Sequence, residues 1–184
     1  MNNIQNIIFD KPIFLIGMMG SWKSTIGRLL ADRLNLQFID TDREIEIGMK
    51  MKIGNIFKLM GEVRFREEEN NTLNRLTNKN NIVVATGGGI VTLKQNCDIL
   101  KSGICIMLRA NATTLSKRIN SIHARPLLNN ETDLETQLKE ILNTRKVSYE
   151  STAHIIVDTD ELEPIQIIDL IIEKLKDIDV NHSR

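Results

Sequence analysis

The chain has 184 residues, a length that predicts one domain with a full-sized hydrophobic core. Its 24 basic and 24 acidic side chains balance, so we expect neither nucleic acid nor an anionic membrane as a partner. No apolar run approaches the length of a membrane span, and the N-terminus lacks a secretory signal. Cys97 and Cys105 have no metal-binding spacing. These features predict a cytoplasmic protein, which we expect to be a monomer.

Short apolar runs alternate with amphipathic segments along the whole chain. In chain order the pattern predicts a strand at 12–17, a helix at 23–35, a strand at 36–40, a helix at 42–60 broken near Gly48 and Gly54, a helix at 61–76, strands at 81–89 and 103–109, a helix beginning at 112–120, a loop at 121–133, a helix at 134–149, a strand at 154–159, a helix at 164–178 and a frayed tail. Strands that are apolar throughout are typical of a parallel sheet covered by helices on both faces. The sequence therefore predicts an α/β fold.

Polar or glycine-rich loops follow three of the predicted strands. They begin at Gly17, Asp40 and Gly87. Ligands of parallel α/β sheets bind beyond the carboxyl ends of the strands, so we expect one shared site there.

The first of these loops, "GMMGSWKS", runs from Gly17 to Ser24 and resembles a phosphate-binding loop. Gly17, Lys23 and Ser24 fit the pattern, whereas Trp22 replaces its second glycine. Lys23 would reach the β- and γ-phosphates and Ser24 would bind Mg²⁺. The expected nucleotide contacts are Gly20, Ser21, Trp22, Lys23, Ser24 and Thr25. The alternative is an ordinary strand–helix turn with a solvent-facing Lys23.

Asp40 and Asp42 lie two residues apart in "DTD", so they would face the same side of extended backbone. One carboxylate could hold Mg²⁺ through water while the other orients or deprotonates an acceptor hydroxyl. A simpler alternative is a helix cap at Thr41 or Asp42.

Arginines and glycines supply the remaining candidates. Arg66 has Glu62 and Glu69 one helical turn away, which by itself predicts a solvated, salt-bridged helix face. The glycines at 87–89 favour close approach of a ligand to the backbone. Arg125 lies in the irregular segment, from which it could reach phosphates. Arg145 and Tyr149 share one helical face, where either could be mere surface decoration.

Together these motifs resemble the shikimate kinase family from about residue 12 to residue 175. The resemblance implies a three-layer, nucleoside-monophosphate-kinase-like P-loop fold with a five-stranded parallel sheet. It implies one kinase domain with a core at about 12–178 and a lid at about 119–131. The implied reaction transfers the γ-phosphoryl of ATP, with Mg²⁺, to the 3-hydroxyl of shikimate on the pathway to aromatic amino acids.

The resemblance also implies a role for each matching residue. Asp42 would be the base, with Lys23 and Arg125 as its catalytic partners, and Asp40 would contact Mg²⁺ through water alongside Ser24. The implied shikimate contacts are Asp42, Arg66, Gly87, Gly88, Gly89 and Arg145. Arg118 matches the position that packs on adenine, and Arg125 of the lid would reach the phosphates.

Trp22 departs from the family pattern at its most specific motif. At positive φ its backbone strain would be roughly 1–2 kcal/mol, which weakens a site without abolishing it. The indole could point outward and leave an active kinase. It could instead enter the nucleotide space, leaving an attenuated kinase or a non-catalytic binding module. It could also be an incidental change, since glycine and tryptophan codons can differ by one base. A related kinase for another hydroxy acid is a further alternative, for which Arg66 and Arg145 favour an acidic acceptor.

Overall fold

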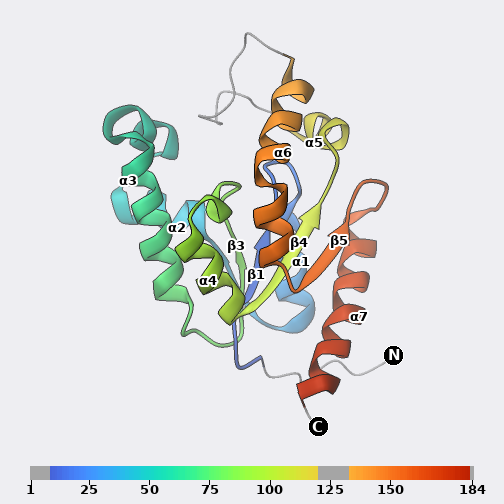
Figure 1. Ribbon diagram of the computed structural model, residues 1–184. Coiled ribbons are helices and arrows are strands. Elements are labelled where there is room, and N and C mark those ends of the chain that lie inside the picture. Colours follow the sequence, from blue (N-terminus) through green and yellow to red (C-terminus); the bar gives the residue numbers. More distant parts are fainter. Residues whose placement is uncertain (1–8, 120–132, 183–184) are drawn as a thin grey trace.

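The computed structural model describes residues 9–119 and 133–182, which form a five-stranded parallel sheet between helices (Figure 1). The strand order is β2-β3-β1-β4-β5, and every neighbouring pair is parallel. The strands are β1 (Ile13–Ile16), β2 (Gln37–Asp40), β3 (Ile82–Ala85), β4 (Ile104–Arg109) and β5 (Ile155–Asp158). All five lie inside the predicted apolar runs, so the predicted parallel sheet is confirmed.

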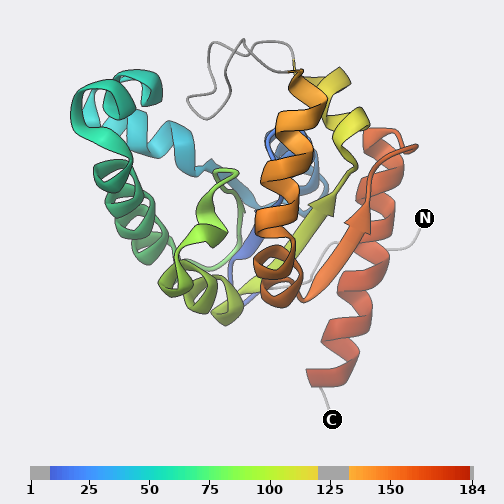
Figure 2. The ribbon, with the colours of Figure 1, turned by 45° about the horizontal axis from the view of Figure 1, so that its top comes forward.

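Helices cover both faces of the sheet and complete three layers. One face carries α1 (Lys23–Leu34) and α7 (Pro164–His182), and the other carries α3 (Ile53–Leu76), α4 (Lys94–Ser102) and α6 (Leu134–Thr152). Two short helices, α2 (Thr41–Met49) and α5 (Ala112–Arg118), directly follow the carboxyl ends of β2 and β4. Figure 2 shows α2 and the start of α3 on one flank and α7 on the other. The functional loops lie between these flanks.

The core consists of two clusters, one on each face of the sheet. Along β1, Ile13 and Leu15 belong to the cluster of α1 and α7, whereas Phe14 and Ile16 belong to the opposite cluster. All four side chains are fully buried, as the side-chain alternation of a strand covered on both faces requires. This packing fixes the strands, and therefore the loops at their carboxyl ends.

The chain between β2 and β3 breaks between Gly48 and Gly54, the two residues near which the break was predicted, and kinks at Gly61, where the predicted second helix begins. Gly48 lies inside α2 and Gly54 inside α3, because a single glycine costs a helix only about 1 kcal/mol. The break falls at Lys50, which adopts a left-handed conformation with φ 50° and caps α2. A kink follows at Gly61, with φ 80° and ψ 171°.

Two further differences concern helices. The sequence pattern gave no helix over 94–102, where α4 forms after the short 3-10 helix η1 (Ile90–Thr92). Its buried face includes Asn96, whose amide donates to the carbonyl of Ile90 at 3.0 Å, so a polar side chain occupies a core position. At the other end of the chain α7 continues to His182, so the predicted fraying does not begin at Asp179. Across the described ranges, no helix combines the length and the apolarity needed to cross a membrane.

Candidate active site

The glycine loop between β1 and α1 surrounds the ammonium group of Lys23. Lys23 Nζ donates to the carbonyl oxygens of Gly17 at 2.9 Å and Met18 at 2.8 Å. The side chain is only 8% exposed, so the solvent-facing lysine of the alternative interpretation is wrong. Ser21, also buried, closes the loop by donating its N–H to the carbonyl of Met18 at 3.2 Å. A positive charge thus lies inside a loop at a helix N-terminus, the arrangement that binds phosphate.

Neighbouring elements hold this loop in shape. Gly17 has φ 144°, and a Cβ there would strike the carbonyl oxygen of Leu108 at the end of β4. Gly20 has φ 80°, and its Cβ would lie 3.1 Å from the carbonyl oxygen of Leu115 in α5. Both contacts involve backbone that cannot easily move. The loop is therefore fixed between β1, β4 and α5.

Trp22 adopts a left-handed backbone conformation, with φ 66° and ψ 21°, the region that favours glycine. Its carbonyl accepts from Ile26 N–H at 2.8 Å, so α1 begins normally. The indole ring lies on the guanidinium group of Arg118, whose Cζ is 3.5 Å from the ring centroid. Such a stack stabilises by about 0.5–2 kcal/mol. The loop is therefore intact, and the indole of Trp22 lies half-buried against Arg118.

Ser24 and Asp40 bring two oxygens together beside the loop. Ser24 Oγ donates to Asp40 Oδ2 at 2.6 Å. Asp40 Oδ1 also accepts from the N–H groups of Asp42 and Arg43, so Asp40 is the cap of α2, rather than Thr41 or Asp42. An exposed hydroxyl and a half-buried carboxylate next to a phosphate loop suit Mg²⁺, which takes few protein ligands and shares phosphate oxygens. No cluster of three acidic, His or Cys ligands occurs among the residues described.

Asp42 lies in the first turn of α2, so the predicted extended backbone is wrong at this position. Its carboxylate and that of Glu69 flank Gly87. A Cβ on Gly87 would lie 2.9 Å from Asp42 Oδ1 and 2.5 Å from Glu69 Oε1. The Gly87 N–H donates to Thr41 Oγ1 at 3.2 Å, which ties the ends of β2 and β3 together. The absence of a side chain at Gly87 thus leaves room for two carboxylates.

Arg66 is a buried residue of α3 rather than part of a solvated helix face. Its side chain donates to Glu69 at 2.5 Å and, through two nitrogens, to Glu62 at 2.7 and 3.1 Å. Arg66 is 8% exposed and Glu69 is fully buried. The buried ion pair fixes the guanidinium group against Gly89, where a Cβ would collide with it.

Gly88 connects the glycines to α6. Its carbonyl oxygen accepts from Arg145 Nη1 at 3.0 Å and from the hydroxyl of Tyr149. Tyr149 is completely buried, and burial raises the pKa of its hydroxyl to about 12, so it remains a donor at neutral pH. Surface decoration is therefore the wrong interpretation for both residues. Arg145 is placed beside the glycines at the same edge of the sheet as Arg66.

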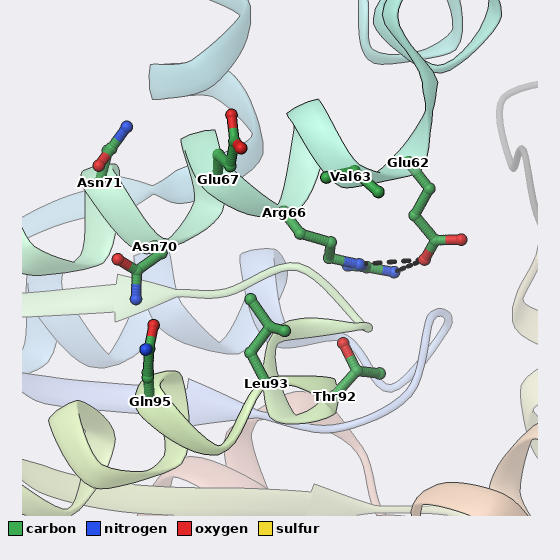
Figure 3. Close-up of a pocket in the computed structure, with 9 residues that line it drawn as sticks. All are labelled: Glu62, Val63, Arg66, Glu67, Asn70, Asn71, Thr92, Leu93 and Gln95. Carbon is green, nitrogen blue, oxygen red and sulfur yellow. Dashed lines mark hydrogen bonds and ion pairs between the residues drawn. The ribbon is translucent and has the colours of Figure 1, made fainter.

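A pocket of about 650 Å³ lies on the outer side of Arg66, between α3 and the segment formed by η1 and the start of α4 (Figure 3). Its lining consists of Glu62, Val63, Arg66, Glu67, Asn70, Asn71, Thr92, Leu93 and Gln95. Figure 3 shows the Arg66 side chain extended toward Glu62 along this pocket. Arg66 is the one predicted site residue in that lining, so the other described candidates lie outside this pocket.

The structure brings together most of the predicted site. The loop residues, Asp40, Asp42, Arg66, the glycines and Arg145 all lie at the carboxyl ends of β1, β2 and β3. Arg118 lies at the end of α5, whereas Arg125 falls outside the described residues. The predicted site residues did not include Glu69 and Tyr149. Their spacing from Arg66 and Arg145 was a signal, but only burial identifies them as fixed partners.

Gly89→Ala is expected to lower the free energy of unfolding by about 1–3 kcal/mol, because the new methyl group would displace a guanidinium held by a buried ion pair. Gly48→Ala is the matched control, since Gly48 lies in the last turn of α2 and a Cβ there meets nothing within 4 Å. The control should be neutral or more stable by up to about 1 kcal/mol. Urea denaturation measures both. Equal stability of the two variants would contradict the close approach of Gly89 to Arg66.

Burial raises the pKa of Glu69 to about 7, against the opposing attraction of Arg66. Because this pKa is higher in the folded than in the unfolded protein, the folded state retains a proton between about pH 4.5 and pH 7. As the pH rises from about 4.5 to about 7, the free energy of unfolding of the parent should therefore fall by up to about 3 kcal/mol relative to that of Glu69→Gln. Urea denaturation of both proteins at several pH values tests this. A constant difference between them would show that Glu69 titrates normally.

Comparison with known proteins identifies the family. A family model described as shikimate kinase matches residues 19–176. A shikimate kinase of Pseudoalteromonas atlantica is 44% identical over 166 residues, which cover 90% of this chain and 96% of the relative. The solved shikimate kinase from Acinetobacter baumannii in complex with shikimate is 35% identical with a TM-score of 0.87, over 91% of this chain and 93% of that one.

A more distant structure shares the fold alone. The deoxyadenosine kinase from M. mycoides with bound dATP has a TM-score of 0.59 at 17% identity, over 90% of this chain and 99% of that chain. The predicted P-loop kinase architecture is thus confirmed beyond one family. The match of sequence, fold and site motifs over nearly the whole chain shows that it belongs to the shikimate kinase family.

Proposed function

We propose that this chain transfers the γ-phosphoryl group of ATP to the 3-hydroxyl of shikimate, giving shikimate 3-phosphate and ADP. One observation carries the proposal. Two sets of residues share one edge of the sheet. One is the phosphate loop, which surrounds Lys23, and the other is a cluster of charged side chains formed by Asp42, Arg66 and Arg145. A kinase needs such neighbouring sites because phosphoryl transfer depends on positioning and charge neutralisation.

The donor half of the site uses the loop and the start of α1. Loop N–H groups and the helix N-terminus would hold the phosphates, and Lys23 would neutralise charge on the β- and γ-phosphates. Ser24 would ligate Mg²⁺ directly and Asp40 through water, which accords with their 2.6 Å hydrogen bond. Bound Mg²⁺ supplies charge neutralisation at the phosphates.

The acceptor half uses the ends of β2 and β3 with α3 and α6. Asp42 would accept the proton of the attacking hydroxyl as a general base. Arg66 and Arg145 would bind the carboxylate of shikimate, for which planar guanidinium groups provide paired donors. The backbone of Gly87, Gly88 and Gly89 would line this side, where Glu69 and Tyr149 act as positioning residues.

Arg125 completes the proposed machinery. In this proposal residues 119–131 form a lid on a single domain with a core at about 12–178, and Arg125 reaches the phosphates when the lid closes. Closure excludes water, which would otherwise compete with shikimate as the phosphoryl acceptor.

A coupled assay of ADP release, with and without shikimate, tests the proposed reaction. Shikimate-dependent ADP release that requires Mg²⁺ is expected. Trp22→Gly assayed in parallel separates an inactive fold from an impaired loop. Quinate and other hydroxy acids complete the panel, since a better substrate among them would replace shikimate in the proposal. ADP release by neither protein with any acceptor would refute it.

A further inference from the structure

Hydrogen bonds to Thr159 hold the guanidinium group of Arg118, which is the cation in the stack with Trp22. Arg118 donates from Nη1 to Thr159 Oγ1 at 2.9 Å and from Nη2 to the carbonyl of Thr159 at 2.5 Å. Thr159 is fully buried and is itself tied to the carbonyl of Arg109. The guanidinium plane therefore has a set orientation, and the indole ring covers one of its faces at 3.5 Å from the ring centroid.

This stack lies on one particular side of the phosphate loop. Asp42, Arg66 and the glycines of the proposed acceptor side follow β2 and β3, and Arg145 of α6 joins them by its hydrogen bond to the carbonyl of Gly88. Arg118 follows β4 and Thr159 follows β5. Because β1 and its loop lie between these two pairs of strands, the two groups flank the loop from opposite sides. A nucleoside triphosphate whose γ-phosphate faces Asp42 must therefore extend its nucleoside toward Arg118.

A planar guanidinium group binds an aromatic ring of a protein and a nucleobase in the same way, by stacking. One face of Arg118 cannot accept both rings. We propose that the indole of Trp22 occupies the nucleobase position on Arg118, so that ATP binds fully only after the indole has been displaced. This inference rests on the proposed function, because it takes the loop as the ATP site.

Displacement requires movement of a side chain only. Trp22 has its backbone fixed by the carbonyl that accepts from Ile26 N–H, but its side chain is half-buried and lies at the edge of a core cluster. The phosphate-binding N–H groups and Lys23 belong to the fixed part of the loop. Trp22 therefore weakens the contribution of the base to affinity and leaves the contribution of the phosphates unchanged.

Two substitutions separate the indole from the backbone strain. Trp22→Ala removes the indole and keeps a Cβ at positive φ, whereas Trp22→Gly removes both. Calorimetry with Mg²⁺ compares ATP with inorganic tripolyphosphate, which has no base. We expect both variants to bind ATP about tenfold more tightly than the parent and to bind tripolyphosphate equally well. An unchanged ATP affinity in Trp22→Ala, or an equal gain for tripolyphosphate, would overturn the proposal.

Arg118→Ala provides a second, independent measurement. In the Trp22→Ala background it should weaken ATP binding about tenfold, since the base then stacks on Arg118. In the parent the loss should be clearly smaller, because Arg118→Ala also releases the indole. Equal losses in both backgrounds would show that Trp22 and the base do not share Arg118.

The same experiments distinguish a failure of the proposed function from a failure of this inference. If the ATP and tripolyphosphate results follow expectation but Trp22→Gly gives no shikimate-dependent turnover, the acceptor assignment is wrong and the competition stands. If no variant binds ATP or tripolyphosphate, the loop is not a nucleotide site and both proposals are overturned. Trp22 is also the sole tryptophan of the chain, so its fluorescence should change with ATP and not with tripolyphosphate.

Discussion

Asp42→Asn is expected to reduce turnover by about 10²- to 10⁴-fold while changing the affinity for shikimate only slightly. Asparagine has nearly the same shape and can still hydrogen-bond a ring hydroxyl, but it cannot accept the proton of the attacking oxygen. The geometry supports this base assignment because Asp42 Oδ1 lies next to Gly87, at the edge of the sheet shared with the phosphate loop. Steady-state turnover and calorimetric shikimate binding measure the two effects separately.

The matched control for this substitution is Asp98→Asn. Asp98 lies on α4 with an exposed side chain and pairs only with Lys94 among the contacts described, so its loss should leave turnover unchanged. Because Asp42 also lies in the first turn of α2, urea denaturation should accompany the assays. Turnover of Asp42→Asn within a few-fold of the parent would exclude Asp42 as the base.

The sequence predicted the sheet well because its strands are apolar on both faces. Ile13, Phe14, Leu15 and Ile16 are all fully buried, because a strand covered on both faces buries every one of its residues. Helix boundaries were less predictable, because tertiary contacts decide them. Lys50 rather than a glycine takes the left-handed cap of α2, and Asn96 fills a core position in α4 through hydrogen bonds that its residue type does not reveal.

The candidate site could be predicted where a residue in its sequence context indicates a single function. A lysine after a strand and a glycine loop indicates phosphate, and Lys23 indeed lies inside the loop. Arg66 was ambiguous, since the same spacing of charges occurs on solvated helices, and only its burial with Glu69 decides the matter. The stack of Trp22 on Arg118 joins residues 96 positions apart in a chain of 184, so no local pattern could have revealed it.

Arg66→Met is expected to weaken shikimate binding about tenfold to hundredfold, because it removes charge-assisted hydrogen bonds to the carboxylate. It should also lower the free energy of unfolding by about 3–5 kcal/mol at pH 8, since the fully buried Glu69 then lacks its partner. The loss of stability should be smaller near pH 6, because without the attraction of Arg66 the pKa of Glu69 lies above its parent value of about 7, so the variant gains more stability than the parent from proton uptake as the pH falls. Calorimetry and urea denaturation at both pH values measure these changes.

The double variant Arg66→Met with Glu69→Leu separates the structural from the functional role of the ion pair. Apolar side chains of similar volume often replace a buried pair without loss of stability, so the double variant should regain most of the unfolding free energy. It should not regain shikimate affinity, because no cation then faces the carboxylate. Recovery of binding together with stability would mean that Arg66 only supports the fold, and that Arg145 alone holds the carboxylate of the acceptor.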